Sequence, residues 1–245
     1  MTNGIYSAVL GARVQDMRLD VIANNVANAD TPGFRRDVPV FSTQTEYLPD
    51  KRFDRDRASL GDANRFFAAV PSFQPGPVHH TGRMGDMAIE GDGFFVVMTP
   101  NGEAYTRGGA FQVDPQGYLA TGQGYQVMGQ GGPIQVEPGA EFTVGTDGTI
   151  NVGDQSVDKL RIAAFEERVS ASKMGKSLLV AAPDAEMVEN PEFTIVDRAL
   201  EGSNVNIVRE MADMIAAGRQ FEAYQRTIRM FDEINKSSSQ SLGRI

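Results

Sequence analysis

Cysteine is absent from this chain of 245 residues, and the only histidines are His79 and His80. The absence of cysteine excludes disulfides, thiolate metal sites and cysteine nucleophiles. The two histidines are neighbours, and neighbouring side chains on a strand point to opposite faces, so the pair is poorly placed to bind one metal ion. The sequence therefore predicts no metal site and no cofactor.

Long apolar runs and an excess of positive charge are also missing. Hydrophobic residues make up 41% of the chain, but no run is long enough to span a bilayer, so we expect no stable membrane insertion. The first residues, MTNGIYSAVLGARVQ, lack the basic, apolar and small-residue segments of a cleavable secretory signal. The formal net charge of -9 argues against binding of nucleic acid.

The acidic residues are concentrated in the middle of the chain. Residues 37–202 contain 13 basic and 24 acidic side chains, whereas residues 1–36 and 203–245 are nearly neutral. Nearly neutral ends suit packing against other protein chains, and an acidic middle suits contact with solvent.

Near the N-terminus, apolar residues recur at helical spacing. The pattern predicts a helix from Gly4 to about Asn28, because a broad apolar face repeats at steps of three and four. Thr31 precedes a proline, and Pro32-Gly33 suits the centre of a type II turn, so the helix ends there. Phe34, just past the turn, is expected to anchor the chain where it leaves the helical layer. The main stripe of the helix consists of Ile5, Val9, Ala12, Leu19, Ile22 and Val26.

A second helix is predicted near the C-terminus, from a cap at Asn204 or Asn206 to about Lys236. Glu210 falls in its first turn, where the helix dipole favours an anion. Its apolar residues alternate steps of four and three, which is the 3.5-residue repeat of a coiled coil. This stripe contains Ile207, Met211, Met214, Gly218, Phe221, Gln225 and Ile228.

The pattern between the helices is typical of short β-strands. Of the 26 glycines, 18 fall between Gly76 and Gly153, and turn signals recur at PNG, PQG and TDG. Short apolar runs between such signals predict strands at 94–98, 111–113, 125–128, 134–136 and 142–144, and strands are also expected in 158–165 and 177–182. The fold class is therefore α+β, with a mostly β central domain of hairpins. Residues 37–74 show no clear period and are interpreted as an extended connector.

The apolar stripes of the two helices need partners. Either the helices pair with each other or with other copies, or they close back on one β domain. Asp20, Asn24 and Asn28 form a polar ridge with Asn25 beside it, and an amide at a helix interface fixes register because any slip leaves it unpaired. We interpret this cluster as part of an assembly interface; a solvated helix end is the alternative.

The sequence contains no strong signal of a catalytic or ligand-binding site. The glycine-rich stretches have neither nucleotide-binding nor P-loop spacing, and no acid, base and nucleophile set converges, so we expect no enzyme. Arg107 and the Arg35-Arg36 pair are interpreted as contacts with a neighbour's acidic surface or as solvated charges. The aromatic residues of the central block predict a β core, with a carbohydrate-binding face as the alternative: Phe94, Phe95, Tyr105, Phe111 and Tyr118.

Three stretches resemble the bacterial flagellar rod and hook axial proteins. They are GIYSAVLGARVQDMRLDVIANNVANADTPGFRR, a central block beginning MAIEGDGFFVVMTPNGEAYTRGGAF, and EGSNVNIVREMADMIAAGRQFEAYQRTIRMFDEI. The resemblance covers residues 1–36, 75–137 and 200–236 in the family's order. Length, the SFQPGPVHHTG segment and the ending SNVNIVREMADMI are most similar to the proximal rod members, with the distal rod members second.

The resemblance implies a structural rod component that is exported through the flagellar type III apparatus without a cleavable signal peptide and assembles in the periplasmic rod. Its partners would be other copies and other rod proteins. It implies a terminal helical assembly domain from 1–36 and 200–245 and a β-rich outer domain at 75–199. A secreted glycan-binding β module is the alternative from another class. The resemblance adds Gln15, Asn24, Asn25, Asn28, Thr31, Gly33, Phe34 and Ile215 to the predicted interface.

Overall fold

In the computed structural model, the described residues are 2–41, 67–165, 171–175, 177–182, 185–189 and 191–242. They form two compact units. The helical unit is drawn from Met1–Ala27, Asp37–Val70 and Asn206–Ile245, and the β unit from Asn28–Arg36 and Pro71–Val205. The predicted α+β class, with paired terminal helices and a mostly β centre, is confirmed.

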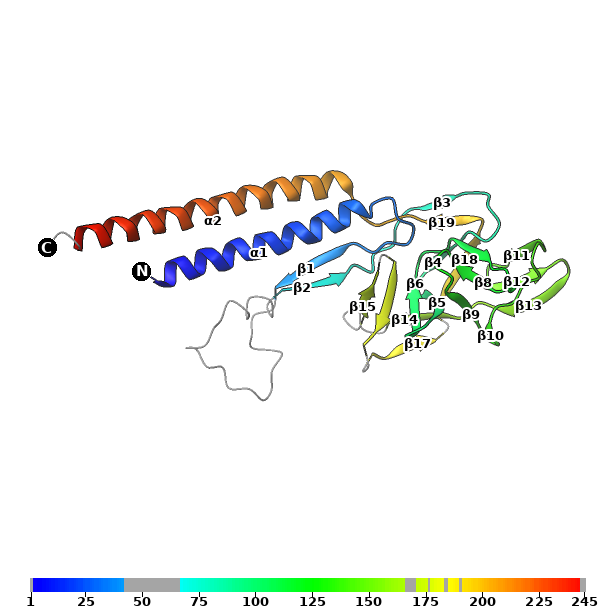
Figure 1. Ribbon diagram of the computed structural model, residues 1–245. Helices are drawn as coiled ribbons and strands as arrows, with labels where there is room; N and C mark the ends of the chain where they lie inside the picture. The colour runs from blue at the N-terminus through cyan, green and yellow to red at the C-terminus, as the bar shows by residue number, and fades with distance from the viewer. Residues whose placement is uncertain are drawn as a thin grey trace. The chain divides into compact units, whose positions relative to one another are not determined.

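The helical unit contains two long helices, α1 (Thr2–Ala27) and α2 (Ile207–Leu242), which lie side by side and antiparallel (Figure 1). Asn206 caps α2, since its side-chain Oδ1 accepts a hydrogen bond from the backbone N–H of Arg209 at 3.0 Å. Helix α2 continues six residues beyond the predicted end at Lys236. The helices therefore begin where the sequence indicates, and α2 is longer than expected.

The predicted connector at 37–74 contains two short strands. These are β1 (Asp37–Phe41) and β2 (Phe67–Pro71), which pair with each other in a two-stranded sheet. Residues 42–66 of the connector lie outside the described residues.

The β unit is built around a ten-stranded sheet whose main path runs β15-β16-β6-β5-β9-β8-β7, with β10, β14 and β17 attached to it. Three smaller sheets are β11-β12-β13, β18-β4 and β19-β3. The strands are β3 (Val78–His80), β4 (Met87–Gly91), β5 (Phe94–Thr99), β6 (Gly102–Thr106), β7 (Phe111–Val113), β8 (Leu119–Thr121), β9 (Gln126–Gly129), β10 (Gly132–Pro133), β11 (Phe142–Val144), β12 (Thr149–Val152), β13 (Gln155–Lys159), β14 (Ile162–Phe165), β15 (Ala171–Met174), β16 (Leu178–Ala181), β17 (Met187–Glu189), β18 (Phe193–Asp197) and β19 (Ala199–Glu201).

Strand β5 is buried on both faces along residues 94–97, which explains their unbroken apolar sequence FFVV. Phe95 and Val97 belong to the larger core, where the Phe95 ring packs edge-on against Phe111 at 5.1 Å. Phe94 and Val96 point to a second, smaller core on the other face. The central aromatic residues are therefore mainly core, as predicted.

The three turn signals are confirmed as tight connections between β5 and β6, β7 and β8, and β11 and β12. The strand predicted at 134–136 is wrong. Only Gln135 makes an isolated bridge there, because the chain turns through Gly132 and pairs the shorter β10 with β9.

Candidate assembly interface

Helices α1 and α2 meet through glycine notches that receive aromatic rings. A Cβ built on Gly11 would lie 2.4 Å from Cε1 of Tyr224, and one built on Gly4 would lie 2.9 Å from Cζ of Phe231. The two glycines are seven residues apart, and so are the two rings. This spacing gives a regular antiparallel seam in which each ring fills the space of a missing side chain.

Replacing Gly11 with alanine is expected to destabilise the helix pair by roughly 1–2 kcal/mol. Overpacking against the Tyr224 ring lowers the free energy of unfolding by about 1–3 kcal/mol. The better helix propensity of alanine raises it by less than about 1 kcal/mol. Thermal unfolding followed by circular dichroism at 222 nm measures the change. In a Tyr224→Ala background the same Gly11→Ala replacement has room and is expected to stabilise; destabilisation in both backgrounds would contradict the notch.

The predicted stripe of α1 is largely covered within the helical unit. Ala12 and Ile22 are buried, and the other five predicted positions on this face are partly buried: Ile5, Val9, Gln15, Leu19 and Val26.

The predicted stripe of α2 is divided. Glu210 and Ala217 are buried, so the seam with α1 runs through a neighbouring register of the same repeat. Four predicted positions lie at its edge and are partly buried: Met214, Gly218, Phe221 and Ile228. Ile207, Met211 and Gln225 of the stripe are exposed, and so is Ile215, which the family resemblance added. Helix α2 thus carries apolar side chains on a face that the described part of the helical unit leaves open.

In the asparagine cluster, Asn25 is the residue that fixes the helical unit. Its side chain is buried, its Oδ1 accepts a hydrogen bond from the backbone N–H of Asp37 at 2.8 Å, and its Nδ2 donates to the carbonyl oxygen of Asp37 at 2.9 Å. Nδ2 also lies 3.3 Å from Oε2 of the buried Glu210. One amide therefore joins α1, the start of β1 and the first turn of α2. Asp20 and Asn24 are exposed.

The predicted type II turn is present in the β unit. The Thr31 carbonyl accepts a hydrogen bond from the N–H of Phe34 at 3.2 Å, and Gly33 has a φ of 68°. A Cβ at Gly33 would lie 2.1 Å from the backbone N of Gly108, so both the angle and the close approach require glycine. Thr31 also hydrogen-bonds to Asn28, and Phe34 is fully buried.

Beside this turn lies a buried ionic cluster that no sequence pattern predicts. The two carboxylate oxygens of Glu201 pair with Nη1 of Arg35 at 2.8 Å and with Nη1 of Arg107 at 3.2 Å. Arg35 and Glu201 are only 2% and 1% exposed. The interpretation of both arginines as contacts to a neighbour or as solvated charges is wrong, because they converge on a carboxylate of the same chain.

Burial dominates the electrostatics of this cluster. It lowers the pKa of Arg35 to about 10, against the attraction of Glu201, and it also lowers the pKa of Arg107. Both guanidinium groups stay charged at neutral pH. Arg107 donates further hydrogen bonds to the carbonyls of Ile89 and Gly91, and Arg35 donates to that of Gln74. The cluster therefore ties the segment after the turn to the strands of the β unit.

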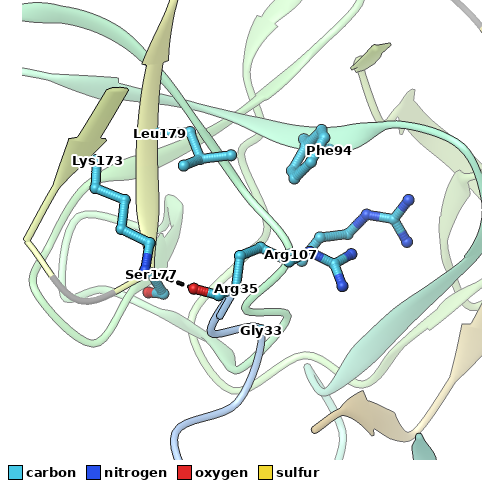
Figure 2. Close-up of a pocket in the computed structure, with 7 residues that line it drawn as sticks. All are labelled: Gly33, Arg35, Phe94, Arg107, Lys173, Ser177 and Leu179. Atoms are coloured by element: carbon cyan, nitrogen blue, oxygen red, sulfur yellow. Dashed lines mark hydrogen bonds between the residues drawn. The ribbon is translucent and has the colours of Figure 1, made fainter. Parts of the chain in front are cut away.

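The hollow beside the cluster is closely packed. Figure 2 shows Arg35 and Arg107 below the Phe94 ring, with Lys173 reaching toward the backbone carbonyl of Arg35. The hollow is too narrow to admit a water molecule, so it offers no room for a small ligand.

The histidines lie on β3, where His79 pairs with Leu200 and His80 with Ala199. Both are exposed. Within the part of the chain that the structure describes, no three potential metal-ligating side chains gather. The main aromatic candidates for a carbohydrate face, Phe94, Phe95, Tyr105 and Phe111, are buried, which leaves them unable to stack on a sugar.

Known families match the segments that build these features. A model described as "Flagella basal body rod protein" matches residues 5–35, "Flagellar hook protein FlgE/F/G D1 domain" matches 88–152, and "Flagellar basal body rod FlgEFG protein C-terminal" matches 196–241. The flagellar basal-body rod protein FlgF of Salmonella typhimurium is 37% identical over 99% of both chains. This chain belongs to the flagellar basal-body rod protein family.

Other rod proteins match over nearly their whole length. FlgF of Escherichia coli is 37% identical over 95% of both chains, and FlgG of Bacillus subtilis is 30% identical over 96% of this chain and 97% of its own. The N-terminal family match includes Asn25 and Phe34, and the C-terminal match includes Glu201, so the features described above fall in segments typical of rod proteins. Among the described helices, none combines the length and apolar character needed to cross a membrane.

Proposed function

We propose that this chain is a structural component of the bacterial flagellar basal-body rod and that its helical unit contacts other copies and other rod proteins. The observation that carries the proposal is the open apolar face of α2. Met211 is 54% exposed and Ile215 is 60% exposed, in a family whose members are rod proteins.

Exposure of these side chains has a free-energy consequence. Full burial of one isoleucine or methionine side chain is worth about 1.5–3 kcal/mol. Several such side chains on one helix face favour association through that face. Val208, also on the outer side of α2, is exposed as well.

We also propose an export route and a location for the chain. The chain is exported through the flagellar type III apparatus and takes its position in the periplasmic rod, without stable membrane insertion and without catalysis. The nearly neutral ends and the acidic middle of the sequence support burial of the helices among protein neighbours. A position in the proximal rod is supported by the SFQPGPVHHTG segment and the SNVNIVREMADMI ending; a distal position is the alternative.

Replacing Ile215 with glutamate tests this function. A carboxylate forced into a protein interface costs several kcal/mol, so the amount of chain in purified basal bodies is expected to fall at least about tenfold, with loss of swimming. The isolated variant is expected to unfold at nearly the wild-type temperature, because Ile215 is exposed there.

Val157→Glu is the matched control, since Val157 is exposed on β13 of the β unit. It is expected to incorporate normally. Incorporation of Ile215→Glu at the wild-type level would contradict the proposed role of α2.

A further inference from the structure

The open face of α2 contains a glycine notch that the described residues do not fill. Ile207, Met211, Ile215 and Gly218 follow one another at steps of four, four and three, and so share a stripe. No described residue outside the helix comes within 4 Å of a Cβ built on Gly218. The notch is therefore open and bordered by the exposed side chains of Met211 and Ile215.

The other helix glycines indicate what such a notch receives. Gly4 and Gly11 each hold an aromatic ring of the facing helix, Phe231 and Tyr224. Among the aromatic residues of the described helices, Tyr6 alone is mostly exposed, at 56%, and Leu10 one turn further along α1 is 37% exposed. Among the described helices, Tyr6 is thus an exposed ring without a facing glycine, and Gly218 is a glycine without a facing ring.

These two features cannot meet within one molecule. The seam places Gly4 against Phe231 and Gly11 against Tyr224, so Tyr6 lies level with about Arg229 of its own α2. Gly218 is eleven residues from that level, or about 16 Å along the helix axis. No ring of the described residues fills this notch, and Tyr6 of the same chain lies too far along the helix axis to reach it.

We propose that Gly218 receives Tyr6 of a second copy, whose α1 packs antiparallel on the open face of α2; this contact rests on the proposed function. In that register Leu10 of α1 lies level with Met214, which extends the apolar contact.

The contact joins two different faces of the two molecules. Such a heterologous interface leaves one α1 and one α2 face free at the ends of every pair, so further copies add in the same way. Addition continues as an open helical array unless the rotation between copies closes a ring. This is the kind of growth that a rod requires.

Cysteine cross-linking tests the contact, because the natural chain contains no cysteine. Cells lacking their own copy would express two differently tagged chains, Tyr6→Cys and Gly218→Cys. Mild oxidation of purified basal bodies is expected to give a disulfide-linked pair carrying both tags, since the bond forms only when the two Cα atoms lie within about 7 Å. The control pairs Tyr6→Cys with Ala223→Cys, an exposed position on another side of α2, and is expected to give no such product.

A second measurement covers variants that fail to assemble. Gly218→Ala is expected to raise the unfolding temperature of the isolated chain, because alanine is the better helix former, while lowering its amount in basal bodies about tenfold. Two results would overturn this contact and leave the proposed function standing, provided that the wild-type chain is present in basal bodies. One is cross-linking of Tyr6→Cys to Ala223→Cys but not to Gly218→Cys. The other is normal incorporation of Gly218→Ala. Absence of the wild-type chain from basal bodies would overturn both.

Discussion

Replacement of Glu201 with alanine is expected to destabilise the β unit by about 3–5 kcal/mol. The substitution leaves the guanidinium groups of Arg35 and Arg107 buried without their shared carboxylate, and an uncompensated buried charge is among the costliest defects in a protein interior. The backbone N–H of Gly76 also loses its hydrogen bond to Oε1, which is 2.8 Å long. Differential scanning calorimetry of the purified chain measures the loss.

The matched control for this prediction is Glu103→Ala. Glu103 pairs with Arg161 at 2.7 Å, but both side chains are about one-third exposed. An ion pair in contact with solvent contributes about 0–1 kcal/mol, so this variant is expected to unfold close to the wild-type temperature. Equal destabilisation by the two replacements would show that burial does not account for the stabilising effect of the Glu201 cluster.

Replacement of Asn25 with alanine is expected to destabilise the helical unit by roughly 2–4 kcal/mol. Both backbone groups of Asp37 lose their partner in a buried place, and each unsatisfied buried group costs about 1–3 kcal/mol. Glu210 loses the amide as well. Urea unfolding followed by circular dichroism at 222 nm reports on this unit, because the long helices lie in it.

Asp20→Ala is the control, since Asp20 belongs to the same polar ridge of α1 and its side chain is exposed. Its replacement is expected to change the free energy of unfolding by less than about 0.5 kcal/mol. A similar loss in both variants would assign the effect to helix propensity or helix-end contacts in general, and not to the junction at Asn25.

The elements with strong periodicity were predictable from the sequence. Both helices begin where the apolar repeats begin, and the hairpins follow the glycine turn signals. The turn at Pro32-Gly33 was also predictable, because a proline followed by a glycine satisfies the two backbone angles of one turn type. These features depend on local rules that a single stretch of sequence contains.

Other features depend on residues far apart in the chain. The seam between α1 and α2 uses a neighbouring register of the heptad from the predicted one, because packing of aromatic rings against Gly4 and Gly11 decides the fit. The pairing of Arg107 with Glu201 joins residues 94 positions apart, and no periodic signal marks it. The assignment of the predicted interface residues to contacts between molecules stays a prediction.

Electron microscopy of basal bodies from cells that lack this chain tests the rod assignment most directly. If the chain is a rod component that other rod proteins build on, the shaft ends early or is absent, and the wild-type gene restores its full length while Ile215→Glu does not. Complete shafts and normal swimming in the deletion strain would contradict the account.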